Sequence, residues 1–465
     1  MGPSFDILRG DCLAVLKTLP DNSFDSVVTD PPYELGFMGK AWDASGIANN
    51  VEVWREALRV LKPGGHLLVF SGSRTYHRMT CAIEDAGFEI RDQIMWVYGS
   101  GFPKSLDVSK AIDKSRAGHA FDEIRDYLRG AIKAAGLTQV QVKTHLGYPA
   151  DSGIVSHWVA NSQPMVPGWA DWSAMKAILP LDDRFDSLIE SAEREKIGEK
   201  RSGIADGGPA RDTIGGGKSV VVDITAPATD AARQWDGWGT ALKPAHEPIC
   251  VARKPLVGTV AANVLAHGTG ALNIDGCRVP AEKATGWGGG GSALYEGGLS
   301  REGGEARMQD AGRWPANLIH DGSDEVLAAF PQSTSGAMKA STQRAAQDVP
   351  GSVCFGTFGG PVSSNDIAGS TGSAARFFYC AKASKSDRGP GNTHPTVKPL
   401  VLMRYLLRLV TPPGGRALDI FAGSGSTIVA GLQEGFNMTG IELSDEYADI
   451  AENRAWGEWA AQLTV

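Results

Sequence analysis

Asp419-Ile420-Phe421-Ala422-Gly423-Ser424-Gly425-Ser426-Thr427 joins an apolar strand, expected over 417–421, to a helix expected over 426–434. The glycines in this turn let the backbone approach a ligand closely, and the following helix offers free amide groups at its start. Glu442 ends the next expected strand, 438–443, where a carboxylate can accept hydrogen bonds from two ribose hydroxyls. The stretch predicts an α/β fold that holds a nucleotide-like cofactor at a strand-to-helix turn.

Two cofactors suit this layout, NAD and S-adenosylmethionine. The dinucleotide fingerprint requires a third small residue, and that position falls on Ile428, which is bulky. This departure favours S-adenosylmethionine.

A second signature, Asp30-Pro31-Pro32-Tyr33, follows an apolar strand expected over 24–29. The exocyclic amine of a nucleobase is a weak nucleophile because its lone pair is conjugated into the ring. Acceptors on both amine hydrogens, the Asp30 carboxylate and the Pro31 carbonyl, would free that lone pair. The two prolines restrict the backbone, and the Tyr33 ring can stack on a base taken out of its helix. The same residues also suit an ordinary strand-ending turn, and the cofactor signature favours the catalytic interpretation.

Strands and helices alternate in both terminal parts of the chain, 1–105 and 376–465. Each part is short for a separate domain, so we expect them to complete one mostly parallel sheet. The remaining expected strands are 5–8, 66–70 and 88–98, and the remaining expected helices are 12–19, 51–61, 73–86, 399–410 and the segment from 445 onward.

The middle of the chain is less regular. Residues 106–180 contain expected helices at 121–135, 138–146 and 154–160, a spacing typical of a helix-turn-helix in which Ser156, His157 and Asn161 could face a DNA groove. An ordinary helical insertion is an equal alternative. Residues 181–219 are expected to be a charged and glycine-rich linker, and 220–375 a target-recognition region with flexible loops.

Composition narrows the functional class. The net charge of -8 argues against a protein that coats nucleic acid nonspecifically, although basic residues cluster between Arg376 and Arg416 as a local patch or a solvated face. The six cysteines contain no C-x-x-C pair, so we expect neither a metal site nor a disulfide framework. No apolar run approaches the roughly 20 residues of a membrane span. We expect a cytoplasmic protein of a bacterial host cell.

With these motifs and this order, the chain resembles the β-class amino-methyltransferases of DNA, in the form common among phages and prophages. In that class the catalytic loop precedes the target-recognition region and the cofactor motifs come last. Gly10-Asp11-Cys12 resembles the segment that contacts the cofactor's adenine, and Leu61-Lys62-Pro63-Gly64-Gly65 the segment after the catalytic motif. His394-Pro395-Thr396-Val397-Lys398-Pro399 resembles the motif that closes over the methionine end.

The resemblance implies a Rossmann-like sheet with a large inserted recognition region, and double-stranded DNA as partner. A homodimer, the target sequence and a restriction partner stay open. The implied catalytic residues are Asp30, Pro31, Pro32 and Tyr33, and the implied cofactor-binding residues are Asp11, Cys12, Asp30, His394, Thr396, Lys398, Asp419, Phe421, Ala422, Gly423, Ser424, Gly425, Thr427 and Glu442.

Other activities of similar proteins fit the sequence less well. A cytosine-carbon methyltransferase needs a cysteine nucleophile, typically after proline, and none of the six cysteines follows a proline. An RNA or protein-glutamine methyltransferase usually has Asn in place of Asp30. A regulator without catalysis is disfavoured because the catalytic and cofactor signatures are both intact. Adenine N6 is favoured over cytosine N4 because Asp in this motif more often accompanies adenine in the family, with Ser commoner for cytosine.

Overall fold

The computed structural model describes residues 2–35, 45–101, 105–116, 118–149, 152–160, 166–192, 195–202, 220–228, 230–280, 312–335, 370–382 and 384–463. They form two compact units. The first comprises Met1–Ser100 and Ala245–Val465, and the second Gly101–Pro244.

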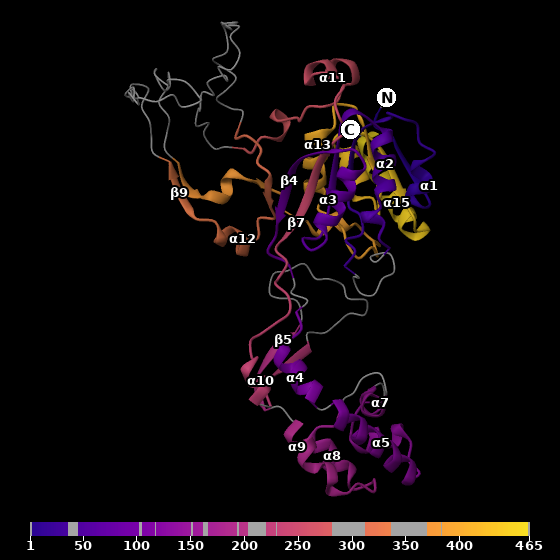
Figure 1. Cartoon of the computed structure of the whole chain (residues 1–465), viewed down its shortest axis with the longest axis vertical. Helices are drawn as coiled ribbons and strands as arrows, with labels where there is room; N and C mark the ends of the chain where they lie inside the picture. The colour runs from indigo at the N-terminus through magenta and orange to yellow at the C-terminus, as the bar shows by residue number, and fades with distance from the viewer. Residues whose placement is uncertain are drawn as a thin grey trace. The chain divides into compact units, whose positions relative to one another are not determined.

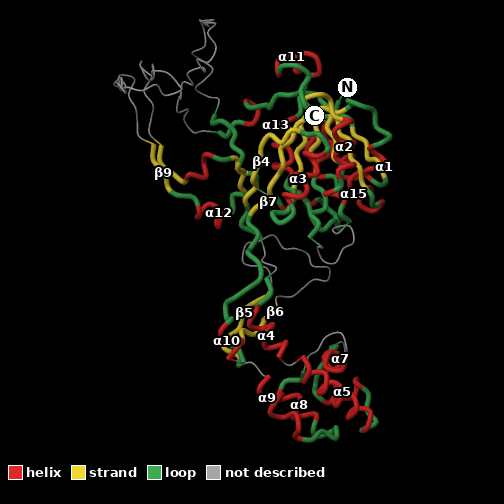
Figure 2. Tube along the Cα trace, viewed as in Figure 1, coloured by secondary structure: helices red, strands yellow, loops and turns green. Residues whose placement is uncertain are grey.

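The first unit is built on a nine-stranded sheet with the order β1-β13-β12-β2-β3-β7-β4-β8-β11 (Figures 1 and 2). Neighbouring strands are parallel except that β7 runs antiparallel to both β3 and β4. The two ends of the chain meet where β12 lies between β13 and β2, which confirms the expected shared sheet. The strands are β1 Phe5–Arg9, β2 Phe24–Thr29, β3 Leu61–Phe70, β4 Glu89–Val97, β7 His246–Arg253, β8 Leu318–His320, β11 Tyr379–Cys380, β12 Arg416–Asp419 and β13 Asn437–Glu442.

Helices cover both faces of this sheet because successive strand residues point to opposite sides. Val27 and Leu67 pack with α1 (Cys12–Leu16), α2 (Val51–Val60) and α3 (Tyr76–Asp85). Val28 and Leu68 pack on the other face with α13 (Leu400–Val410), α14 (Ser426–Gln433) and α15 (Asp445–Leu463). All four of these side chains are fully buried. The near-continuous apolar strands of the sequence are therefore the middle layer of a three-layer α/β/α unit.

Two local expectations need correction. The Lys-Pro-Gly-Gly segment was expected to separate α2 from the next strand, yet β3 already begins at Leu61. The β2–β3 register shifts at this point, and a Cβ on Gly65 would lie 2.9 Å from the carbonyl oxygen of Asp25, so glycine allows the strands to pass closely. A helix was expected over 73–86, but α3 begins at Tyr76 after Thr75.

The segment 220–375 was not expected to contribute strands to the sheet. In the structure, β7 and β8 of this segment are strands of the sheet. The segment also contains the short helices α11 (Val260–His267) and α12 (Asp324–Ala329). Strand β7 is central because Ile249, Cys250 and Ala252 are fully buried. The segment also forms an antiparallel pair of strands, β9 (Gln332–Ser335) and β10 (Ser370–Ser373). Of the two glycine-rich loops expected there, 286–312 lies outside the described residues except for Gly312, and 363–373 is described from Ser370, where it forms β10.

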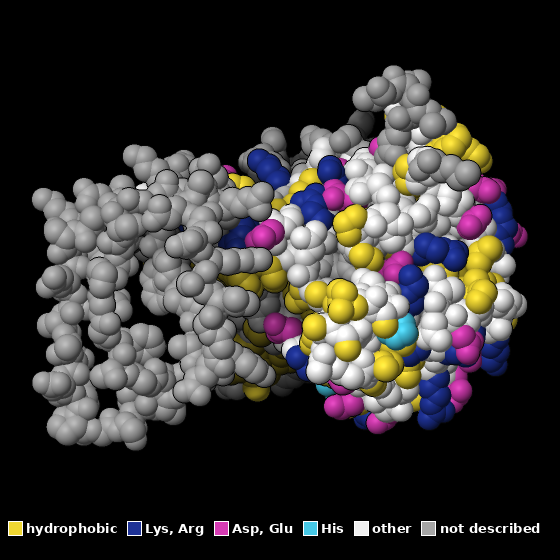
Figure 3. Space-filling view, turned by 90° about the horizontal axis from the view of Figure 1, so that it is seen from above, with side chains coloured by type: hydrophobic (Ala, Val, Ile, Leu, Met, Phe, Trp, Pro, Cys, Tyr) yellow, Lys and Arg dark blue, Asp and Glu magenta, His cyan; other side chains and the backbone are white. Residues whose placement is uncertain are grey.

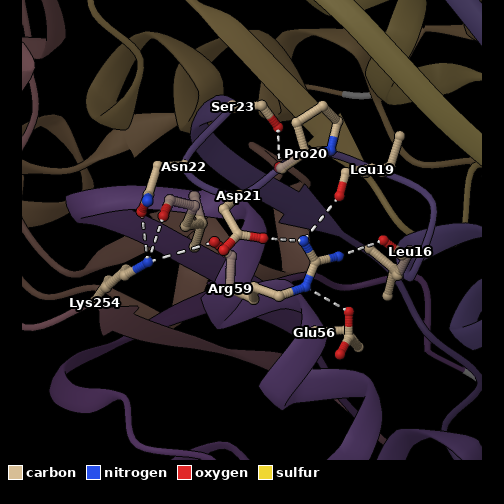
Figure 4. A network of polar contacts seen from close by, with 10 residues as sticks. Leu16, Leu19, Pro20, Asp21, Asn22, Ser23, Glu56, Arg59 and Lys254 are labelled. Atoms are coloured by element: carbon tan, nitrogen blue, oxygen red, sulfur yellow. Dashed lines mark hydrogen bonds and ion pairs between the residues drawn. The ribbon is translucent and has the colours of Figure 1, made fainter.

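A polar network fixes the chain that leads into β2 (Figure 4). Arg59, at the end of α2, donates to the carbonyls of Leu16 (2.7 Å) and Leu19 (2.8 Å). Lys254, after β7, donates to the carbonyl of Leu61 at 2.7 Å. These side chains satisfy backbone groups that the ends of short elements leave unpaired, and they fix the entry of the strand that carries the Asp-Pro-Pro-Tyr motif.

The second unit is mainly helical. Its core packs Trp172, Ile124 and Leu128 with residues of the three helices expected from sequence. Thr138 and Gln141 form a capping box at the start of the second of them. The helices are α4 Val108–Arg116, α5 Gly118–Ala134, α6 Gln139–His145, α7 Ile154–Val159, α8 Trp169–Met175, α9 Asp186–Ala192 and α10 Asp230–Gln234.

The expected linker, 181–219, contains ordered elements in its described part. Helix α9 buries Ile189 in the helical core, and β5 (Lys196–Ser202) pairs antiparallel with β6 (Val220–Thr225). Charge and glycine content concealed one buried apolar residue and one strand pairing, which are the interactions that order this segment.

Candidate active site

The candidate residues meet at one edge of the sheet. Asp11 follows β1, Glu442 ends β13, Asp419 ends β12 and Asp30 follows β2. The carboxyl ends of these parallel strands lie side by side, and the amino end of the antiparallel β7 reaches the same edge. In open α/β sheets this edge is where ligands bind.

The glycine-rich loop is closed by Glu442. One carboxylate oxygen, Oε2, accepts from the Gly423 amide at 2.8 Å, and Oε1 accepts from the Ser444 amide at 2.9 Å. Gly423 and Gly425 have φ values of 52° and 78°, and a Cβ on Gly425 would lie 2.9 Å from the Ala451 Cα. Each carboxylate oxygen keeps a second lone pair that could accept from a ligand hydroxyl. Burial raises the pKa of Glu442.

Asp419 joins the start of this loop to β2, the strand that precedes the Asp-Pro-Pro-Tyr motif. Its Oδ1 accepts from the Thr29 hydroxyl at 2.6 Å and from the Phe421 amide at 3.1 Å. Burial raises the pKa of Asp419 to about 6, although the hydrogen bonds from Thr29, Thr427 and Phe421 favour the ionised form. Asp419 and Thr427 are thus engaged inside the loop, and Ala422 is held by a bond of 2.9 Å from its amide to the Ile441 carbonyl.

The Ser424 hydroxyl accepts from the Asn392 amide at 3.0 Å and from the Arg454 guanidinium at 3.1 Å. Arg454 also donates to the Ser424 and Asp387 carbonyls. Arg454, on α15, therefore ties the glycine-rich loop to the segment that precedes His394. Sequence reasoning missed both Asn392 and Arg454, which lie in no motif and are recognisable only from these contacts.

The segment with the sequence His-Pro-Thr-Val-Lys-Pro contacts two parts of the site: its histidine contacts the glycine-rich loop, and its lysine contacts the Asp-Pro-Pro-Tyr motif. The His394 ring packs on the glycine-rich loop, since a Cβ on Gly423 would lie 3.0 Å from its Nε2. Its Nδ1 lies 2.5 Å from the Thr396 carbonyl oxygen, and its ring meets the edge of Tyr447 with centroids 4.5 Å apart. Burial lowers the pKa of His394. His394 and Thr396 are therefore beside the expected cofactor loop.

Lys398 lies instead against the catalytic motif. Its Nζ donates to Asp30 Oδ2 at 2.7 Å and to the Tyr33 hydroxyl at 3.0 Å. The other carboxylate oxygen, Asp30 Oδ1, is buried and makes no hydrogen bond within the described part of the chain. Thr75, missed as a site residue, donates to the Tyr33 carbonyl at 2.7 Å and so holds the end of the motif. One oxygen of Asp30 is fixed and the other remains available for a donor.

Glu247, at the start of β7, completes this cluster and was not found from sequence. The Tyr33 hydroxyl donates to Glu247 Oε2 at 2.8 Å, and Lys398 Nζ lies 3.2 Å from the same oxygen. Burial, with the charges of Asp30 and Glu247, raises the pKa of Tyr33 well above its usual range. The only sequence signal for this residue is a carboxylate directly before a buried apolar strand.

Asp11 and Cys12 lie at the adjoining strand. The Asp11 carboxylate accepts from the Ala14 amide at 2.9 Å as the cap of α1, and the Gly10 amide donates to the Glu442 carbonyl at 2.9 Å. Cys12 is buried, and burial raises the pKa of its thiol to about 12. The pair follows Arg9 and Gly10, which lie beside Glu442, and its contact with a cofactor stays a prediction.

Three arginines of the basic run from Arg376 to Arg416 are engaged within the protein. Arg404 and Arg408 both pair with Glu434, at 2.7 Å and 2.6 Å, and Arg388 donates to the His394 carbonyl. On the face drawn in Figure 3, basic and acidic side chains are interspersed with hydrophobic ones. Within the described residues there is no cluster of three or more His, Cys, Asp or Glu side chains suited to a metal, and no helix combines the length and apolar character of a membrane span.

Comparison with protein families agrees with this arrangement. The model of the N6/N4 methyltransferase family, described as DNA methylase, matches residues 24–125 and 237–453. The chain belongs to this family. The match excludes 126–236, which covers most of the second unit.

Individual relatives match over shorter stretches. A putative methylase YubD of Escherichia coli (strain K12) is 46% identical over 61 residues, which is 13% of this chain and 27% of that protein. The type II methyltransferase M.HpaI of Haemophilus parainfluenzae is 32% identical over 113 residues, 23% of this chain and 36% of that protein. The matched regions thus span only about a third of these relatives or less.

Two solved structures match the chain at low similarity, with scores that carry no argument about its fold or activity. The M1.HpyAVI–SAM complex is 12% identical, with 97% of this chain and 98% of that chain covered and a TM-score of 0.33. The PvuII DNA methyltransferase (cytosine-N4-specific) is also 12% identical, with coverage of 97% and 88% and a TM-score of 0.37. Scores this low carry no argument about substrate.

Proposed function

We propose that the protein transfers a methyl group from S-adenosylmethionine to an exocyclic amino group of a base in double-stranded DNA, with adenine N6 as the target. The observation that carries the proposal is the state of Asp30: Oδ2 is held by Lys398 at 2.7 Å, whereas Oδ1 is buried without a hydrogen-bond partner among the described residues. A buried acceptor of this kind needs a donor, and an amine hydrogen supplies one.

The residues present fit S-adenosylmethionine. Gly423 and Gly425 adopt the positive φ values of a tight glycine turn ahead of the α14 amide groups, and Glu442 retains acceptor capacity for ribose hydroxyls. Asp11 follows Gly10, which bonds to Glu442, and His394 packs on Gly423, in keeping with adenine and methionine contacts. The bound cofactor would supply an electrophilic methyl group on its sulfonium.

The catalytic motif would act on the amine by accepting a hydrogen bond from each of its two N–H groups. Asp30 Oδ1 would accept one and the Pro31 carbonyl the other. Lys398 keeps the carboxylate in one orientation through Oδ2. Because the acceptors are held before the reaction, they stabilise positive charge on the nitrogen as it develops without further reorganisation.

Tyr33 would provide the stacking surface for the base. Its hydroxyl is bonded to Glu247 and Lys398, and its carbonyl to Thr75, so the ring is fixed at its tip and at the backbone. Enzymes that modify a base within duplex DNA take it out of the stack, and an aromatic ring recovers part of the lost stacking energy.

Mass spectrometry of nucleosides from DNA incubated with the protein and labelled cofactor tests this proposal. N6-methyladenine is the expected product, and N4-methylcytosine would transfer the same mechanism to the alternative base. Absence of both bases, with methylation of RNA or of protein instead, would refute DNA as substrate. Sequencing that detects modified bases then defines the recognised site in the DNA of a bacterial host.

We infer that target recognition lies outside the catalytic residues, in 106–180 and 220–375. In the helical unit the Ser156 hydroxyl donates to the Gln139 side chain at 3.1 Å, which joins α6 to α7, while Ser156 and His157 remain exposed. Asn161 lies outside the described residues. Four basic residues of this unit could contact phosphate: Arg125, Arg129, Lys133 and Lys143. Arg125 and Arg129 pair with acidic residues and Lys143 is buried, so the exposed Lys133 is the better candidate.

A further inference from the structure

The cluster around Lys398 contains a carboxylate for which the proposed reaction has assigned no task. Glu247 has a side chain 18% exposed, and its Oε2 lies 2.8 Å from the Tyr33 hydroxyl and 3.2 Å from Lys398 Nζ. Burial raises the pKa of Tyr98, and the charge of Glu247 and a hydrogen bond to its side chain raise it further. Glu247 thus binds Lys398, which holds Asp30 in place, and the Tyr33 hydroxyl, which also contacts Lys398.

The contacts of Lys398 fix its direction. The ammonium group has three hydrogens, and three groups surround it: Asp30 Oδ2 at 2.7 Å, the Tyr33 hydroxyl at 3.0 Å and Glu247 Oε2 at 3.2 Å. The rings of Tyr33 and Phe70 lie 5.2 Å and 4.9 Å from Nζ. Removal of one charged partner would free Lys398 to move relative to Asp30.

We propose that Glu247 is a positioning residue for the loop that carries Asp30 and Tyr33. Glu247 holds Lys398 and the Tyr33 hydroxyl so that Asp30 presents Oδ1 to the base. The inference rests on the proposed methyl transfer, and it assigns the orientation of the catalytic carboxylate to a residue of β7. Within the described residues the polar partners of Glu247 lie outside the glycine-rich loop, so its effect should fall on the transfer step rather than on the cofactor.

A purely stabilising role explains these contacts less well. Two carboxylates and one ammonium in a buried site lose hydration, and such groups often stabilise a fold no better than apolar residues of the same shape. Burial alone lowers the pKa of Lys398, but Asp30 and Glu247 raise it above its usual range. The lysine is therefore retained as a cation, which serves the orientation of a carboxylate.

The test compares E247Q with E89Q. Glu89 pairs with Arg253 at 2.6 Å on the same two strands, β4 and β7, but about 20 Å along the strands from Glu247 at roughly 3.3 Å per residue. E247Q should lower the single-turnover methylation rate by about 10- to 100-fold, the scale expected for a misplaced catalytic group, with cofactor affinity unchanged. E89Q should leave both quantities unchanged.

A second readout does not require methylation. At alkaline pH, trace acetylation followed by peptide mass spectrometry should show greater modification of Lys398 in E247Q than in the wild type, because its pKa falls when one neighbouring charge is removed. Modification of other lysines should be unchanged. If the wild-type protein methylates no DNA, the proposed function fails, and the acetylation result still decides whether Glu247 controls Lys398.

Two outcomes would overturn the inference. The first is a wild-type rate in E247Q with wild-type acetylation of Lys398. The second is a rate loss accompanied by weaker cofactor binding and increased acetylation of lysines throughout the chain, which would make Glu247 part of the scaffold. A cycle with Y33F adds a check, since Tyr33 and Glu247 share a hydrogen bond and their effects on the rate should be non-additive.

Discussion

Replacement of Asp30 by alanine removes the acceptor at the centre of the proposed site. A hydrogen bond to a charged acceptor contributes roughly 1.5–3 kcal/mol. If that bond strengthens as charge develops on the amine, its loss slows transfer by about 10- to 150-fold, at roughly 1.4 kcal/mol per factor of ten. Lys398 also loses its 2.7 Å partner and retains the more distant Glu247 at 3.2 Å. We therefore expect a decrease of about 100-fold or more.

Single-turnover transfer of labelled methyl groups measures this step directly, and calorimetry measures cofactor affinity in the same preparation. Affinity should be retained because the glycine-rich loop is held by Glu442 and Asp419 rather than by Asp30. D275A is a suitable control, since the Asp275 side chain is 86% exposed and forms its ion pair with nearby Arg278. Methylation by D30A at close to the wild-type rate would refute the proposed mechanism.

Three further predictions concern the cofactor, pH and DNA. Glu442→Ala should weaken S-adenosylmethionine binding through lost charge-assisted hydrogen bonds of roughly 1.5–3 kcal/mol, and Gly425→Val through displacement of the loop from Ala451; unchanged affinity in both would locate the cofactor elsewhere. Burial raises the folded pKa of Asp419 from its usual 3.8 to about 6. The stabilising contribution of this group, up to about 3 kcal/mol, is therefore present below about pH 4 and lost as the pH rises through about 6. The difference in unfolding free energy between the wild type and Asp419→Asn should change by this amount between those pH values, and a constant difference in urea unfolding would disprove it. Deletion of 121–161 should leave cofactor binding intact but relax the methylated motif or reduce the salt dependence of DNA affinity. The salt slope should fall by about 0.9 log unit for each phosphate that the shortened protein no longer binds. An identical motif and salt slope would assign the segment to scaffolding.

The sequence alone was sufficient for features that depend on neighbouring residues. Apolar residues at helical spacing predicted α2, α5 and α13, and short apolar runs predicted β2 and β13. All five elements lie within a few residues of the expected limits. The turn at Gly423 and Gly425 was also recognisable, because its positive φ angles favour glycine whatever the surroundings. The short length of the two terminal α/β parts further indicated that they share a sheet.

The tertiary structure alone decided which distant side chains meet. Strand β7 enters antiparallel between β3 and β4, and this topology brings Glu247 to Tyr33 and Lys398. Lys398, expected to bind the cofactor, lies on Asp30, and Arg454 reaches the glycine-rich loop from the final helix. Local propensity depends on spacing along the chain, whereas these contacts depend on strand order and on the burial that makes a polar group seek a partner.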